Sequence, residues 1–174
     1  QMQITNASCE KYERYNGQFL PEIAKSVGRS YFDTMLDILH ESSAEARVLF
    51  HDYYNEEIID RLMQHPAAIF ASDSWPEPGG HQNPAAYGTF PKFLRNARER
   101  ETLSLEEVVH KMTGAAAERF RLKARGALRK GYAADVTVFD WERIGDRENA
   151  TGDASPSGIE RVFINGKQVL GEDR

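Results

Sequence analysis

The stretch Ile69-Phe70-Ala71-Ser72-Asp73 is a short apolar run that ends on a carboxylate. A turn-rich segment follows from Ser74 to His81, and Tyr87-Gly88-Thr89-Phe90-Pro91-Lys92 comes after it. A buried strand that ends on an acidic residue is how a parallel α/β barrel presents an acid at its mouth. The sequence therefore predicts a barrel strand over residues 69–72 and a candidate catalytic acid at Asp73.

A second short apolar run, Val48-Leu49-Phe50, lies upstream of the first. Between the two runs, Asn55 can cap a helix whose inward face would carry the apolar side chains Ile58, Ile59, Leu62 and Met63. A strand, a helix and a strand at this spacing predict a βαβ unit with parallel strands. Both runs are continuously apolar, which is typical of strands that are covered on both faces.

Local end signals predict further helices. Pro21 suits a first helical turn, and Gly28 suits the position just past a last turn. Residues 30–33 and 104–107 have the spacing of capping boxes, so each predicts the start of another helix. A helix is also expected over residues 91–100.

The sequence changes character near residue 126 and becomes β-like. Residues 136–139 predict a strand, and Asn165-Gly166 between two β-like runs is a strong hairpin signal, in which Lys167 could extend the loop. We therefore expect two parts: residues 1–125 as an α/β part and residues 126–174 as a small β unit.

The composition excludes several classes of function. The formal net charge is −5, and no basic stripe stands out, so nucleic acid is not an expected partner. Cys9 is the single cysteine, which fits a reducing, cytoplasmic compartment. No apolar run approaches the roughly 18 residues that a membrane-spanning helix needs, so no membrane partner is expected.

Asp73 has no visible chemical partners in the sequence. No cluster of histidines, cysteines and acids has metal-ligand spacing, and Ser72 lacks a paired base. One carboxylate does not complete a hydrolytic site, because the attacking water must be activated and the carbonyl polarised. We therefore expect the chain to be part of a larger enzyme and to be inactive alone.

Several motifs, in order, carry a resemblance to a known family. The chain resembles the N-acyl-D-amino-acid deacylases (D-aminoacylases) of the amidohydrolase superfamily, and the match is to their C-terminal portion. The motifs are Ala71-Ser72-Asp73, Tyr87-Gly88-Thr89-Phe90-Pro91-Lys92, Leu103-Ser104-Leu105-Glu106-Glu107, Lys111-Met112-Thr113, Arg125-Gly126-Ala127-Leu128-Arg129-Lys130-Gly131 and Ala134-Asp135-Val136-Thr137-Val138-Phe139-Asp140.

The resemblance implies an α/β fold: the C-terminal fragment of a metal-dependent (β/α)₈ barrel, followed by strands of a small β domain. It makes residues 48–50 and 69–72 the last two barrel strands. It also implies zinc in the complete enzyme, held mainly by residues that align upstream of Gln1. We expect this fragment to bind none itself.

The resemblance also implies roles for individual residues. Asp73 would transfer a proton during hydrolysis of a small N-acyl-D-amino acid and would touch the weaker metal position. Residues 74–88 would cover the substrate, with His81 and Tyr87 as contacts. The family often has Gly where this chain has Ser74, and His-Pro-Arg where this chain has Asn83-Pro84-Ala85, so the preferred substrate stays open.

Two alternatives to a linear-amide deacylase stay open. One is a related amidohydrolase for cyclic amides, of the dihydroorotase or hydantoinase kind, although Gly88-Thr89-Phe90-Pro91 favours the deacylases. The other is a non-catalytic fragment that self-associates, because lone barrel strands expose edges and apolar faces.

Overall fold

The computed structural model describes residues 1–52 and 55–171, and the chain divides into two compact units. The first unit contains most of the first third of the chain together with Ser74–Ala86 and Glu148–Ala154. The second contains Glu56–Asp73, Tyr87–Arg147 and the segment that follows Ala154. Both units therefore draw on segments that are far apart in the sequence.

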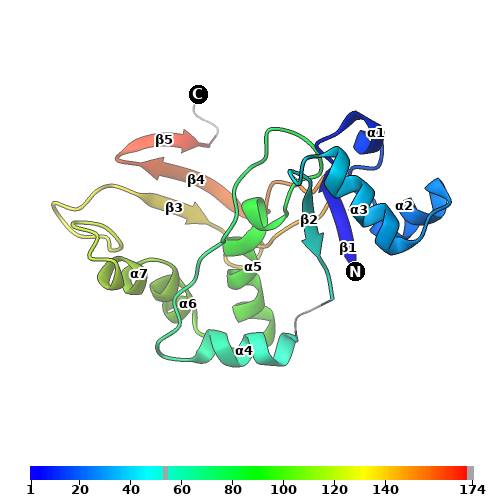
Figure 1. The fold of residues 1–174 in the computed structure, drawn as a ribbon. Helices are drawn as coiled ribbons and strands as arrows, with labels where there is room; N and C mark the ends of the chain where they lie inside the picture. Colours follow the sequence, from blue (N-terminus) through cyan, green and yellow to red (C-terminus); the bar gives the residue numbers. More distant parts are fainter. Residues whose placement is uncertain (53–54, 172–174) are drawn as a thin grey trace. The chain divides into compact units, whose positions relative to one another are not determined.

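The first unit is built on a two-stranded antiparallel sheet (Figure 1). Strand β1 (Met2–Asn6) pairs with strand β2 (Arg47–Phe50), with Ile4 opposite Val48. The helices α1 (Glu10–Glu13), α2 (Leu20–Val27) and α3 (Tyr31–Glu41) lie between these strands in the chain. The core consists of Ile4, Ala7, Tyr12, Tyr15, Leu20, Ile23 and Ile38.

The predicted helix ends of the first unit are confirmed. Pro21 lies in the first turn of α2, and Gly28 ends this helix with a φ of 68°, a left-handed conformation that glycine adopts without a side-chain clash. Ser30 precedes α3, and its side chain accepts a hydrogen bond from the backbone N–H of Asp33. These caps satisfy backbone groups that a helix end leaves without partners.

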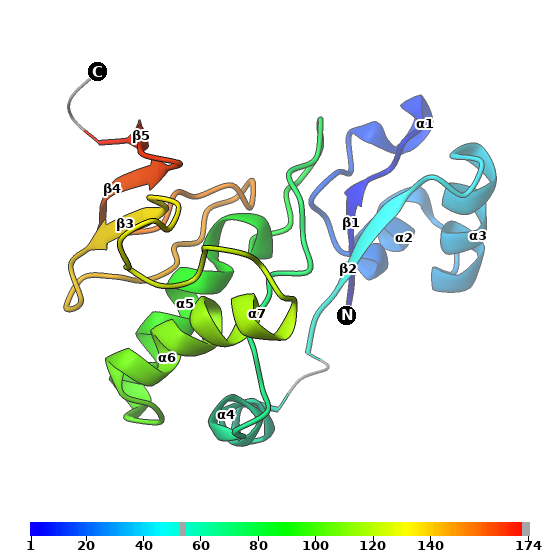
Figure 2. The ribbon, with the colours of Figure 1, turned by 90° about the vertical axis from the view of Figure 1, so that its left-hand side faces the viewer.

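The second unit combines helices with a three-stranded antiparallel sheet (Figure 2). Its helices are α4 (Glu56–Gln64), α5 (Ala85–Arg100), α6 (Leu105–Met112) and α7 (Gly114–Arg119). Its strands β3 (Val136–Phe139), β4 (Ile159–Ile164) and β5 (Lys167–Leu170) are adjacent in that order. The core consists of Met63, Phe70, Leu94, Ala97, Val108 and Ile144.

The β-hairpin predicted at Asn165-Gly166 is confirmed. The two residues have φ angles of 51° and 80°, and they connect β4 directly to β5. Positive φ at both central positions is the mark of a tight type I′ turn, whose twist matches that of the flanking strands. Lys167 is the first residue of β5, so it lies outside the loop.

The predicted parallel βαβ unit is wrong in this structure. Strand β2 pairs antiparallel with β1, and residues 67–73 form no strand. A strand needs a neighbour that accepts its backbone hydrogen bonds. The backbone of residues 67–73 has a different neighbour, since the Phe70 N–H donates to the main-chain oxygen of Lys111 in α6 at 3.3 Å.

Two helix predictions also need correction. Helix α5 begins at Ala85 rather than near Pro91, so the expected loop is shorter and Pro91 lies inside the helix. The Asn83 side chain accepts a hydrogen bond from the Ala85 N–H at 3.0 Å, and an Asn followed by Pro is a helix-start signal. In α4, Met63 is buried as predicted, but Leu62 is 60% exposed.

The expected division near residue 126 concerns the parts of a complete enzyme, and it stays a prediction.

Across residues 1–52 and 55–171, none of the helices has both the length and the apolar character needed to cross a membrane.

Candidate active site

Asp73 ends a segment that follows α4 in the second unit. Its side chain is exposed, and its φ is 48°, in the left-handed region that aspartate visits more readily than most residues. Within the described part of the chain, no hydrogen bond or ion pair engages this carboxylate. The carboxylate is therefore accessible at the surface of the second unit.

His81 lies in the first unit, in the segment Ser74–Ala86. Its backbone N–H donates to the Thr5 oxygen at 2.7 Å. The half-buried ring lies beside two glycines: a Cβ added at Gly17 or at Gly152 would come within 3.2 Å of a ring nitrogen. The ring is thus packed within this unit, and the glycines leave the room for it.

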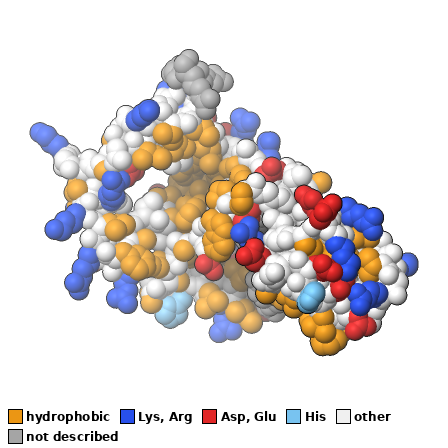
Figure 3. Space-filling model, turned by 45° about the horizontal axis from the view of Figure 1, so that its top comes forward, with side chains coloured by type: hydrophobic (Ala, Val, Ile, Leu, Met, Phe, Trp, Pro, Cys, Tyr) orange, Lys and Arg blue, Asp and Glu red, His pale blue; other side chains and the backbone are white. Residues whose placement is uncertain are grey.

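Tyr87 lies in the first turn of α5 and belongs to the second unit. It lines a cavity of about 610 Å³ whose other walls are mainly apolar. Hydrophobic side chains gather around this hollow (Figure 3). The cavity residues come from α5, α6 and the sheet, and they include Phe90, Leu94, Met112, Val136, Phe139 and Val162.

The three predicted site residues are divided between the two units. Tyr87 lines the apolar cavity and Asp73 does not, although both belong to the second unit. His81 belongs to the first unit. Asp135 is the acidic residue of the cavity wall, but it forms an ion pair with Arg125 and accepts the Asn165 N–H at 2.8 Å. The Asn165 hydrogen bond lowers the pKa of Asp135.

A metal shell is absent from residues 1–52 and 55–171, where no three His, Cys, Asp or Glu side chains gather closely enough to hold an ion. The ring of His51, for example, contacts the side chains of Gln3 and Phe19. Its Nε2 lies 2.9 Å from the side-chain oxygen of Gln3, and its ring meets Phe19 edge-on at 5.2 Å between ring centres.

Lys111 is a residue of this region whose place the sequence analysis missed. Lysine side chains are mostly exposed, so the motif Lys111-Met112-Thr113 does not by itself predict burial. In the structure it is buried on the inner face of α6 with Val108, three residues earlier. A lysine in register with a buried apolar stripe is the signal that could have found it.

The comparisons agree on one family. A sequence model described as "Amidohydrolase family" matches residues 16–170. The N-acyl-D-aspartate deacylase of Alcaligenes xylosoxydans xylosoxydans is 35% identical over 86% of this chain and 31% of its own length. The D-aminoacylase of the same organism is 33% identical over 94% of this chain and 33% of its own length.

A solved structure gives the same answer for the fold. The N-acyl-D-glutamate deacylase of Bordetella bronchiseptica, crystallised with zinc and a phosphonate that mimics the tetrahedral intermediate, superposes with a TM-score of 0.86 at 28% identity. The superposition covers 99% of this chain and 35% of that protein. The predicted fold class and family resemblance are therefore confirmed.

The chain spans about a third of the length of the curated relatives that it matches over most of its own length. The family match covers residues 16–170, which is most of the sequence. This chain belongs to the amidohydrolase family.

Proposed function

We propose that this chain is the part of an N-acyl-D-amino-acid deacylase that carries the proton-transferring carboxylate, Asp73. The complete enzyme would split a linear N-acyl-D-amino acid into a carboxylate and a free D-amino acid. Support comes from the curated relatives, which are named as deacylases of N-acyl-D-aspartate and N-acyl-D-glutamate and as a D-aminoacylase. The linear-amide reading is therefore favoured over cyclic amides.

One observation carries the choice of Asp73. The other described aspartates of the second unit have partners for their carboxylates. Asp60, Asp135 and Asp146 pair with Arg100, Arg125 and Arg95, and Asp140 accepts the Glu142 N–H. Asp73 has no such partner among the described residues, and it is exposed in a left-handed backbone conformation. Unusual backbone at a chemically able side chain is a feature of functional sites.

The chemistry assigned to Asp73 is proton transfer. The carboxylate takes a proton from the attacking water as the water oxygen bonds to the amide carbon. The protonated acid then gives this proton to the amide nitrogen as the carbon–nitrogen bond breaks. Such general acid–base help contributes roughly 10²–10⁴-fold in rate, provided that the carboxyl lies within hydrogen-bond reach of both atoms.

Zinc does not fit the residues of this chain alone, because the described residues contain no cluster of three suitable ligands and catalytic zinc sites use about three protein ligands. We assign only Asp73 to the surroundings of the metal. The remaining ligands would come from residues outside this chain, and the isolated chain is expected to bind no zinc and to be inactive. His81 and Tyr87 remain proposed substrate contacts.

A chimera tests this function. The chain replaces the matching third of the Alcaligenes xylosoxydans xylosoxydans D-aminoacylase, and a second, smaller chimera receives only residues 67–88. Both are assayed with N-acetyl-D-amino acids and with dihydroorotate and hydantoins. We expect turnover of the linear substrates. A folded, zinc-loaded chimera of either kind that hydrolyses only cyclic amides, or neither class, contradicts the proposal.

Asp73→Asn in the active chimera is expected to lower kcat by roughly 10²-fold or more. Asp52→Asn is the matched control, because Asp52 is also exposed and also has a left-handed backbone, with a φ of 61°. Equal losses of kcat in the two variants would contradict the proposed role of Asp73.

A further inference from the structure

Lys111 is a buried residue whose ammonium group donates hydrogen bonds to one segment, residues 65–68. The residue is 8% exposed, and its Nζ donates to the main-chain oxygens of His65 at 2.6 Å and Ala68 at 3.1 Å. A buried ammonium group is costly unless its donors are satisfied. Within the described part of the chain it forms no ion pair with a carboxylate, so these two carbonyls are its main polar partners.

The same segment also binds back to Lys111. The Phe70 N–H donates to the Lys111 main-chain oxygen at 3.3 Å, and the Lys111 Nζ lies 5.9 Å from the centre of the Phe70 ring. The Phe70 ring in turn stacks on Phe93 of α5, with 4.4 Å between ring centres. Residues 65–70 are therefore fastened to α6 and α5 from their beginning to their end.

Asp73 follows this fastened segment after Ala71 and Ser72. Its own side chain is exposed and makes no hydrogen bond or ion pair with described residues, so nothing local fixes its position. Upstream of Asp73, Phe70 is the nearest residue whose N–H makes a described backbone hydrogen bond. A proton-transferring group loses efficiency when it is displaced by even about 1 Å.

We propose that Lys111 is a positioning residue for Asp73. Its ammonium group holds residues 65–70 against α6. The position of this segment then determines the position of Asp73, which follows it in the chain. The inference rests on the proposed function for the role of Asp73. The contacts between Lys111 and residues 65–70 do not depend on the proposed function.

The anchoring is tested in the 174-residue chain by hydrogen exchange. Lys111→Met keeps most of the apolar stem and removes the charge. We expect amide exchange to rise at least about tenfold at the hydrogen-bonded amides of Ala67, Ala68 and Phe70, with α5 and β4 unchanged, because local opening follows the lost hydrogen bonds. Lys111→Arg keeps a cation with several donors and should return part of the protection.

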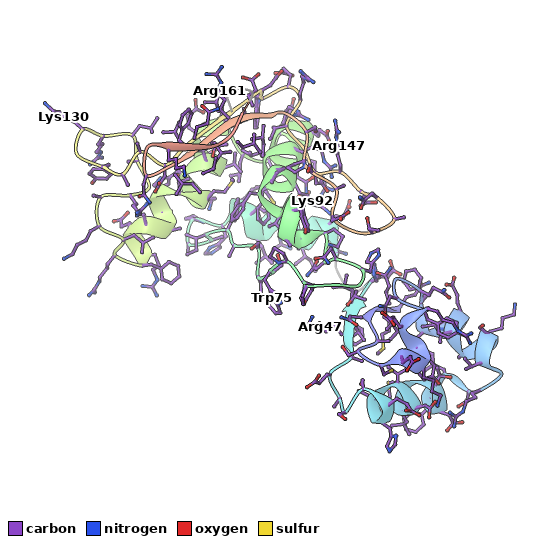
Figure 4. All side chains as sticks on the ribbon, turned by 90° about the horizontal axis from the view of Figure 1, so that it is seen from above. Arg47, Trp75, Lys92, Lys130, Arg147 and Arg161 are labelled. Carbon is purple, nitrogen blue, oxygen red and sulfur yellow. The ribbon has the colours of Figure 1, made fainter. Side chains whose placement is uncertain are left out.

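Lys130→Met is the matched control. Lys130 is exposed in the loop between α7 and β3, and its side chain points away from the unit (Figure 4). This variant should leave exchange at Ala67, Ala68 and Phe70 unchanged. Unchanged exchange in Lys111→Met, or an increase spread evenly over the second unit, would overturn the anchoring.

The positioning role is tested in the active chimera. We expect Lys111→Met to lower kcat at least about tenfold while KM changes less than about twofold, because a displaced proton carrier affects the chemical step rather than binding. Lys111→Arg should recover part of kcat. A normal kcat in a variant with increased exchange would overturn the link to Asp73. If the unmodified chimera hydrolyses no N-acyl-D-amino acid, the proposed function fails, and the exchange experiment still decides the anchoring.

Discussion

Arg95 and Asp146 form an ion pair that ties α5 to the loop that follows β3, with 2.6 Å between Nη1 and Oδ1. The Asp146 side chain is 11% exposed, so the pair is largely shielded from water. Gly88 lies seven residues before Arg95 on the same helix, and a Cβ at Gly88 would come 2.8 Å from the Asp146 Cβ. The glycine of the Tyr87-Gly88-Thr89 motif is therefore needed for a close approach inside the second unit.

Gly88→Ala should destabilise the chain although alanine favours helices. The added methyl group collides with Asp146 and pushes it away from Arg95. We expect the free energy of unfolding to fall by about 1–3 kcal/mol, as for other overpacked sites. Urea unfolding followed by circular dichroism measures this change.

Gly79→Ala is the control for that substitution. A Cβ at Gly79 would meet nothing within 4 Å, and its φ is not in the left-handed range. Its effect should stay within about 0.5 kcal/mol. If Gly88→Ala is as harmless as Gly79→Ala, the close approach of Asp146 to α5 is wrong.

Asp37 links stability of the first unit to pH. Its carboxylate accepts hydrogen bonds from Lys11 Nζ at 2.6 Å and Tyr12 OH at 2.5 Å, and it pairs with Arg29 at 2.9 Å. The Lys11 hydrogen bond is the largest cause that holds the pKa of Asp37 well below its ordinary value. The folded chain therefore binds this proton more weakly than the unfolded chain does.

The sign of the pH effect follows from the lowered pKa. The contribution of Asp37 is present above the unfolded-state pKa of about 4 and is lost as pH falls toward the lower folded-state value. We expect Asp37→Asn to unfold more easily than the natural chain at pH 7 and to show a shallower loss of stability in acid. Glu45→Gln, at an exposed loop residue, should keep the natural acid slope. Parallel acid slopes in all three chains would contradict the linkage.

Ser104 caps the N-terminus of α6, and its substitution should weaken this helix. Its side chain accepts the Glu107 N–H at 3.2 Å, and its own N–H donates to the Glu107 carboxylate at 2.8 Å. Loss of this cap in Ser104→Ala should cost about 1 kcal/mol of unfolding free energy. Ser155→Ala, at an exposed serine outside the helices, is the control and should be neutral. Equal thermal midpoints for the two variants would refute the cap.

Features that depend on neighbouring residues were predictable from the sequence. The caps at Ser30 and Ser104 act within three residues, and the Asn165-Gly166 turn acts within two, so no knowledge of distant contacts is required. The start of α5 was also readable, because Asn83-Pro84 is a local signal.

Features that depend on distant partners were not predictable. The apolar run that ends at Asp73 has the composition of a strand, but its backbone binds α6, where the Phe70 N–H reaches the main-chain oxygen of Lys111. The burial of Lys111 depends on the same contact. For the candidate site, the sequence identified Asp73 as an available acid, whereas the joint use of Asp73, His81 and Tyr87 stays a prediction.

Self-association of the isolated chain is the last prediction. Several large apolar side chains of the second unit are exposed, including Leu128 at 82%, Phe120 at 67% and Leu122 at 53%. Neighbouring exposed apolar residues favour association because burying them removes about 25 cal/mol per Å² of unfavourable hydration. We expect the chain to elute from a sizing column above its monomer mass of 19.7 kDa, in a concentration-dependent way.

The double variant Leu122→Glu with Leu128→Glu should shift elution toward the monomer. The control Lys123→Glu changes the net charge by the same amount at an exposed polar position and should not shift elution. If the unmodified chain stays monomeric at all concentrations, the prediction is wrong, and these exposed apolar side chains do not cause association.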